Sequence, residues 1–178
     1  MPVAAAVVAL ALCAMPSAAV AQATGCAFTR SAASVQPEPN VRTALRCLVN
    51  ATRSAHGLPA LRSSARLNAA ADQFSADMVA RGYFAHVTPD GRSVTDRIRA
   101  TGYLGGSSDW ALGEDIGWGT GTASTPDSIF QAFMNSPPHR HVILSRDFRE
   151  IGVGVAPGVP VAGESGGSTF VLDFGHVG

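Results

Sequence analysis

Three polar residues stand in contexts typical of functional side chains. His86 follows an aromatic pair where a helical pattern has just ended, and His139 follows two prolines at the start of a turn. Glu114 lies in an apolar, glycine-rich run, where a buried carboxylate needs a partner. One interpretation is that Glu114 fixes the tautomer of His139. The simpler alternative is that Glu114 caps backbone amides or pairs with Arg140.

The histidines do not form a sequence motif for a metal. No pair has the H-E-x-x-H spacing of a helical zinc site. His141 follows His139 by two residues, so on a helical turn the two side chains face apart. A catalytic zinc normally has three protein ligands, and the spacing therefore predicts at most a weak site for a divalent metal.

The N-terminus has the pattern of a secretory signal peptide. An apolar run of Ala, Val and Leu from Val3 to Leu12 is followed by Pro16 and by small-residue cleavage sites ending at Ala21 and Ala23. The apolar run is shorter than the roughly 20 residues of a membrane span, so we do not expect an integral membrane protein. Cleavage after Ala21 predicts a chain that is secreted to the extracellular space or the periplasm.

Two cysteines remain after this cleavage, Cys26 and Cys47. An even count in a secreted chain predicts a disulfide, whose loop closure stabilises the fold by roughly 3 kcal/mol. The alternative is lipidation of Cys26, because residues 23–26 loosely resemble a lipobox.

Composition indicates one ordinary domain without the cluster of basic residues that binds nucleic acid. The chain has 13 basic residues, all arginine, and 13 acidic residues, and they are scattered along 178 residues. We divide the chain into a signal peptide at 1–21, a flexible Ser, Thr and Pro-rich arm at 22–39, and a single domain at 40–178.

Periodicity predicts helices in the first part of the domain and strands in the last. The expected helices run from the Asn40 N-cap to about Gly57, from Ser63 or Ser64 to Gly82, from Ser93 to Gly102, and from Thr125 to Ser136, after which a short turn carries His139. Residues 151–155 and 170–174 alternate strictly and predict two antiparallel strands. This order indicates an α+β architecture.

Several of these segments also resemble one known family, the bacterial CAP superfamily of SCP-like domains (cysteine-rich secretory proteins, antigen 5, pathogenesis-related 1). The glutamate segment is similar to the family signature G-E-N-[IL], with Asp115 in place of Asn. The second histidine segment is similar to W-x-x-S-P-x-H-R, with Phe133 in place of Trp. The resemblance covers about residues 43–175. The segments that carry it include Asn50-Ala51-Thr52-Arg53, Gly57-Leu58-Pro59, Gly82-Tyr83-Phe84-Ala85-His86, Pro89-Asp90-Gly91, Arg97, Gly102-Tyr103, Gly113-Glu114-Asp115-Ile116, Ser136-Pro137-Pro138-His139-Arg140, Ile151-Gly152-Val153-Gly154 and Asp173-Phe174-Gly175.

The resemblance implies a three-layer α-β-α sandwich with a mainly antiparallel central sheet. It implies that His86 and His139 are the histidine pair of a cavity, with Glu114 as its first acid. The second acid of the family has no counterpart, and Ser136 stands near its place. Some family members bind divalent metal at the histidine pair, and some bind sterols or other lipids.

Three functions remain open. We expect a non-enzymatic extracellular module that binds a lipid, glycan or peptide in a cleft formed by His86, Glu114, Ser136 and His139, with no required cofactor. The first alternative is a metal-dependent hydrolase of the cell envelope, with zinc on the two histidines. The second is a structural envelope protein whose polar cluster only stabilises the fold.

Overall fold

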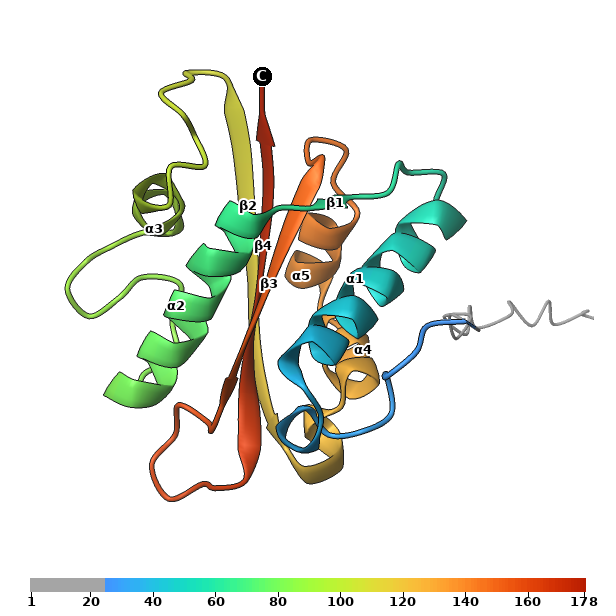
Figure 1. The fold of residues 1–178 in the computed structure, drawn as a ribbon, viewed down its shortest axis with the longest axis vertical. Coiled ribbons are helices and arrows are strands. Elements are labelled where there is room, and N and C mark those ends of the chain that lie inside the picture. The colour runs from blue at the N-terminus through green and yellow to red at the C-terminus, as the bar shows by residue number, and fades with distance from the viewer. Residues whose placement is uncertain (1–24) are drawn as a thin grey trace, which may run out of the picture.

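A central sheet separates two layers of helices (Figure 1). The computed structural model describes residues 25–178, so the predicted signal peptide at 1–21 lies outside the described residues. One face of the sheet is covered by two helices, α2 (Ala65–Arg81) and α3 (Val94–Ala100). The other face is covered by three, α1 (Glu38–Ala55), α4 (Pro126–Asn135) and α5 (Pro137–Ile143). The predicted three-layer α+β sandwich is confirmed.

The sheet has four strands in the order β1-β3-β4-β2. Their bounds are β1 Arg62–Ser63, β2 Trp110–Thr120, β3 Glu150–Pro157 and β4 Gly167–Val177. The pairs β3–β4 and β4–β2 are antiparallel, which confirms the predicted pairing of residues 151–155 with 170–174. The short β1 pairs with β3 in parallel, so the sheet is mixed but mainly antiparallel. β2 is an edge strand, and this position determines where the site lies.

Most of the local helix signals act as the sequence predicts. The Ser64 hydroxyl accepts a hydrogen bond from the Leu67 amide, and Gly82 ends α2 in the left-handed conformation at φ 63°. Ser93 and Asp96 form a capping box at the start of α3. The predicted N-cap at Asn40 is wrong, because α1 already begins at Glu38. Pro39 fits the first turn, where its missing N–H leaves no hydrogen bond unmade.

The segment that carries His139 is helical, which corrects the predicted short turn. Ser136 ends α4 and also precedes α5, and the two prolines that follow it occupy the first positions of α5. Prolines are well tolerated there because the first N–H groups of a helix have no intrahelical acceptor. His139 is therefore held in the first turn of a helix.

Two glycines of β3 bring α2 directly onto the sheet. A Cβ atom on Gly152 would fall on the backbone of Leu67, and one on Gly154 would fall on the backbone of Ala71. The alternating glycines thus leave no room for side chains between this strand and α2. On the other side of the sheet, larger side chains fill the core, among them Phe130, Phe133, Phe170, Leu172 and Phe174.

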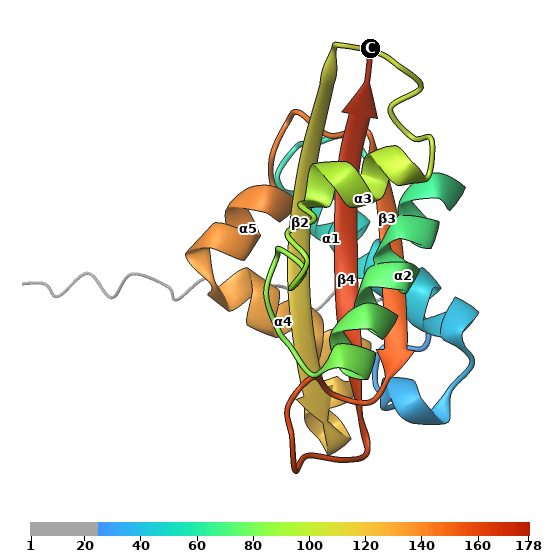
Figure 2. The same cartoon turned by 90° about the vertical axis from the view of Figure 1, so that its left-hand side faces the viewer.

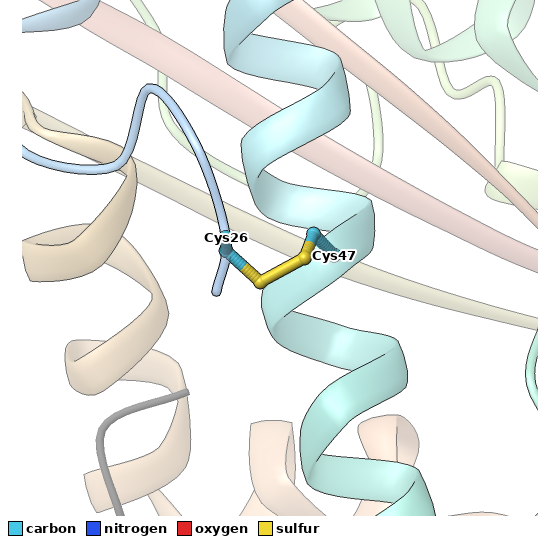
Figure 3. Close-up of a disulfide and its surroundings, with 2 residues drawn as sticks. All are labelled: Cys26 and Cys47. Atoms are coloured by element: carbon cyan, nitrogen blue, oxygen red, sulfur yellow. A yellow bond between two sulfur atoms is a disulfide. The ribbon is translucent and has the colours of Figure 1, made fainter. Parts of the chain in front are cut away.

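The N-terminal segment is fastened to α1 by the predicted disulfide (Figure 3). Cys26 and Cys47 are bonded, with their Cα atoms 5.7 Å apart. This pairing leaves Cys26 no free sulfur for a lipid. Near the disulfide, a short 3-10 helix at Ala33–Val35 places Ala33 in the core.

Candidate functional site

The polar centre of the site joins three elements of the fold. His86 lies in the loop between α2 and α3, Glu114 lies in the middle of β2, and Arg97 lies in α3. The Nδ1 atom of His86 is 2.8 Å from Glu114 Oε1. Arg97 Nη2 donates a 2.5 Å hydrogen bond to Glu114 Oε2. The Glu114 side chain is 3% exposed and that of His86 is 54% exposed, so a buried carboxylate supports an accessible imidazole.

Arg97 also fastens the loop that carries His86. Its Nη1 atom donates to the main-chain oxygens of His86, at 2.9 Å, and of Arg92, at 3.1 Å. The guanidinium stacks over the ring of Phe74, 3.4 Å from the ring centroid. Sequence reasoning assigned no role to Arg97, which is one of two arginines in the short helix α3.

The predicted partners of Glu114 are wrong. Glu114 contacts neither Arg140 nor His139; its hydrogen-bond partners are His86 and Arg97. The reason is the alternation of β2, because Glu114 points toward the layer of α2 and α3. His139 belongs to α5, in the layer on the other face of the sheet.

His139 lies in the first turn of α5. Its ring packs against Phe133, with ring centroids 5.2 Å apart, and its Nδ1 atom is buried with no hydrogen-bond partner among the described residues. Burial lowers the pKa of His139, and the nearby charge of His86 lowers it further. The lowered pKa favours the neutral form of the His139 imidazole.

An apolar pocket of about 230 Å³ has His139 in its lining, whereas His86 and Glu114 are not among its lining residues. The pocket takes residues from the loop before α3, from the edge strand β2, and from both α4 and α5. Figure 2 shows this edge strand between the layer of α2 and α3 and the layer of α4 and α5. Its polar lining residues are Ser136 and His139. The other lining residues are Phe84, Ile116, Gly117, Trp118, Ile129, Ala132 and Phe133.

A second acid, Asp173, lies beside Glu114. In the sequence it is not near Ser136, the position that the family resemblance implied for a second acid. Asp173 of β4 is directly opposite Glu114 in the sheet and is fully buried. Burial raises the pKa of Asp173 well above its ordinary range. The charge of Glu114 raises it further, while Arg97 opposes the rise. Sequence reasoning missed Asp173 because it alternates with apolar residues on a strand, which is also the pattern of a solvent-facing carboxylate.

Asp115 is a buried carboxyl of a different kind. It lies next to Glu114 on β2 and therefore points to the opposite face of the sheet, where Leu172 is its cross-strand neighbour. Neither carboxyl oxygen has a hydrogen-bond partner among the described residues. Burial, with a smaller contribution from the charge of Glu114, raises the pKa of Asp115 to about 8.

The donor set fits a weak metal site better than a catalytic one. His86 has one ring nitrogen bound to a carboxylate, the arrangement that orients histidine ligands in many metal proteins. His139 contributes a buried, unpartnered nitrogen. Within residues 25–178, no three His, Cys, Asp or Glu side chains gather in a group that would hold a metal ion.

Replacing Glu114 with glutamine tests whether this carboxylate supports the fold. We expect Glu114→Gln to lower the free energy of unfolding by about 2 kcal/mol, because one of the two donors to Glu114 then faces an amide N–H₂ and the buried Arg97 loses its counter-charge. Urea melts of both proteins measure the difference, with Glu164→Gln, at an exposed loop position, as the control. An unchanged midpoint for Glu114→Gln would show that the carboxylate is solvated.

Comparisons with known proteins agree with the fold. The model of the cysteine-rich secretory protein family, CAP, matches residues 47–174. The uncharacterized protein YkwD of Bacillus subtilis is 36% identical over 107 residues, which is 60% of this chain and 39% of that protein. The chain thus spans well under half the length of this relative.

Solved structures show the same fold. An extracellular protein from Bacillus anthracis that contains an SCP domain is 26% identical, with a TM-score of 0.61 over 76% of this chain and 40% of that one. An outer surface protein of Borrelia burgdorferi is 18% identical, with a TM-score of 0.63 over 75% of this chain and 90% of that one, and shares the fold. The chain therefore belongs to the CAP family, the cysteine-rich secretory protein family.

Proposed function

We propose that this chain is an extracellular, non-enzymatic binding module whose ligand places an apolar group in the pocket at the edge of β2. The observation that carries the proposal is the pocket itself, about 230 Å³ in volume and lined mainly by aromatic and aliphatic side chains. Concave apolar sites with a few polar groups at the rim are the usual form of a binding site for a small molecule or a side chain.

The chemistry of the lining narrows the class of ligand. Phe84, Trp118 and Phe133 offer an apolar surface, while His139 and Ser136 offer hydrogen bonds at one end. A lipid or a peptide with an apolar side chain matches this distribution better than a glycan, whose hydroxyl groups would face apolar walls. The ligand is therefore an amphipathic molecule with a polar group beside the histidines.

An extracellular location is part of the proposal. The sequence has the pattern of a signal peptide, and the chain contains a disulfide, which persists in oxidising compartments. The similar protein from Bacillus anthracis is described as extracellular. In the part of the chain from residue 25 onward, no helix is long and apolar enough to cross a membrane.

The fluorescence of Trp118 reports directly on the pocket. The chain has two tryptophans, and Trp110 does not line the pocket, so a Trp110→Phe variant isolates the signal of Trp118. We expect dodecanoate or a phenylalanine-containing peptide to change the emission of Trp118 with saturation, and chitobiose to have no effect. Absence of any saturable change with all three probes would favour the alternative of a structural envelope protein.

We also propose that His86 and His139 bind a divalent metal weakly. The donors that support this are the imidazole of His86, oriented by Glu114, and the unpartnered nitrogen of His139. When bound, the metal would supply a positive charge at the polar end of the cleft. The hydrolase alternative has no specific observation in its favour. A catalytic zinc normally takes three protein ligands, and no three His, Cys, Asp or Glu side chains gather within residues 25–178.

Calorimetric titration with zinc at pH 7.5 measures this metal binding. We expect a weak site in the parent protein and at least a tenfold loss of affinity in His86→Ala and in His139→Ala, because each variant removes one of two ligands. His141→Ala, at an exposed position of α5, is the matched control and keeps the parent affinity. If both single variants bind zinc as tightly as the parent, the proposed metal site is wrong.

A further inference from the structure

Arg97 is linked to both ends of His86, directly at its main chain and through Glu114 at its ring. Its Nη1 atom binds the main-chain oxygen of His86 at 2.9 Å, and its Nη2 atom binds Glu114 Oε2, while Glu114 Oε1 binds the ring of His86 at 2.8 Å. A single planar guanidinium therefore holds the backbone of the histidine and the carboxylate that orients its ring. The arginine side chain is only 7% exposed, so this frame is inside the protein.

We propose that Arg97 is the positioning residue of the site: by holding the His86 backbone and the Glu114 carboxylate in one frame, it keeps His86 in the tautomer with its proton on Nδ1. An ionised carboxylate only accepts hydrogen bonds, so the ring nitrogen that faces Glu114 carries the proton. The Nε2 atom of a neutral His86 then has a free lone pair. This is the atom that accepts a hydrogen bond from a ligand or binds a metal.

Arg97 is one of the residues that fasten the loop carrying His86; Arg81 of α2 also reaches this loop, through a 2.8 Å hydrogen bond to Asp90. The loop's own turn is closed by hydrogen bonds from the Gly91 amide to Thr88 and from the Thr88 amide to Arg92, which shape the loop but do not join it to the sheet. The Nη1 atom of Arg97 binds the main chain at both His86 and Arg92 and thereby joins the loop to α3.

Lysine does not reproduce this arrangement. A guanidinium presents five donors in a rigid plane, whereas an ammonium is one compact point charge. The plane of Arg97 is also stacked on Phe74 at 3.4 Å, which fixes the direction of its donors. Arg97→Lys keeps the positive charge but loses the planar set of N–H donors that binds Glu114 and the main-chain carbonyls of His86 and Arg92 at the same time.

Long-range ¹H–¹⁵N spectra of the imidazole rings test this inference in the mature, disulfide-bonded chain. The spectra are recorded at pH 8 for the parent, Arg97→Lys, Arg97→Gln and Arg92→Lys. In the parent we expect a protonated Nδ1 and an unprotonated Nε2 for His86. Both Arg97 variants are expected to show averaged shifts for the two nitrogens, because His86 then exchanges between tautomers.

Arg92→Lys is the matched control. Arg92 lies in the same loop, its side chain is 53% exposed and pairs only with Asp90, so its replacement should leave the His86 pattern unchanged. A parent spectrum with the proton on Nε2 overturns the inference whether or not the variants fold. A folded Arg97 variant with the parent pattern also overturns it.

The inference rests on the proposed function only in assuming that the cleft binds a ligand. The role of Arg97 and the binding function can therefore fail independently of each other. The tautomer is measured without any ligand or metal. A parent protein that shows the expected pattern and its loss in the Arg97 variants supports the role of Arg97, even if no probe enters the pocket.

Discussion

Replacing Gly154 with alanine is expected to lower the free energy of unfolding by about 3 kcal/mol or more. The added Cβ would fall on the backbone of Ala71 in α2, and backbone cannot rotate away as a side chain does. The helix must therefore move off the sheet, and this loosens the packing of Phe74 and Met78 between them. Urea or thermal melts of the purified variant measure the loss.

Gly117→Ala is the matched control for this packing argument. Gly117 is also a strand glycine, but a Cβ there would meet the ring of Phe133 at 3.0 Å, and a side chain has room to adjust. We expect this variant to lose about 1 kcal/mol, at the low end of overpacking costs. If Gly154→Ala is no less stable than Gly117→Ala, α2 does not pack directly on β3.

Replacing Asp115 with asparagine is expected to stabilise the protein by about 3 kcal/mol at pH 7. Burial without a hydrogen-bond partner raises the pKa of Asp115 to about 8, from an ordinary value of 3.8. The folded state must therefore take up a proton at pH 7, while the unfolded state remains ionised. Asparagine has nearly the shape of the protonated acid and takes up no proton.

The pH dependence gives the sign of this effect. Between pH 3.8 and about 8 the folded state binds more protons at Asp115 than the unfolded state, so the contribution of this group to stability falls as pH rises. The gain from Asp115→Asn should accordingly be about 1 kcal/mol at pH 5 and larger at pH 7. Urea melts at both pH values test this, with Asp109→Asn, at an exposed position, as the control. An equal gain at the two pH values would show that Asp115 is ionised in the folded protein.

The elements that could be predicted from the sequence are those fixed by neighbouring residues. A cap such as Ser64 or Ser93 satisfies backbone donors within three positions, and Gly82 adopts a left-handed conformation locally, so these helix ends are visible in the sequence. The strands around residues 151–155 and 170–174 alternate regularly. β2 alternates only loosely, because several of its positions are glycines that make room for α4, α5 and Phe148.

The sequence could predict several residues of the candidate site, but not which residues contact one another. The family resemblance singled out His86, Glu114 and His139, but the partner of Glu114 depends on which face of β2 its side chain occupies. That choice brings Arg97 and Asp173 to the carboxylate, and neither is adjacent to it in the sequence. The pocket also combines residues from both helical layers around the sheet edge, a consequence of strand order that no local pattern encodes.

Filling the pocket tests the central claim, that the cleft binds an amphipathic ligand, most directly. Ala132 lines the pocket from α4, and Ala132→Phe should occupy the space of the ligand, whereas Ala80→Phe adds the same group to an exposed position of α2. Titration of the Trp110→Phe protein with dodecanoate and with the phenylalanine-containing peptide gives the affinity in each background. The account predicts saturable binding of at least one probe, retained in Ala80→Phe and weakened at least tenfold in Ala132→Phe. Equal affinity in the two backgrounds, or no binding of either probe to the parent, would contradict it.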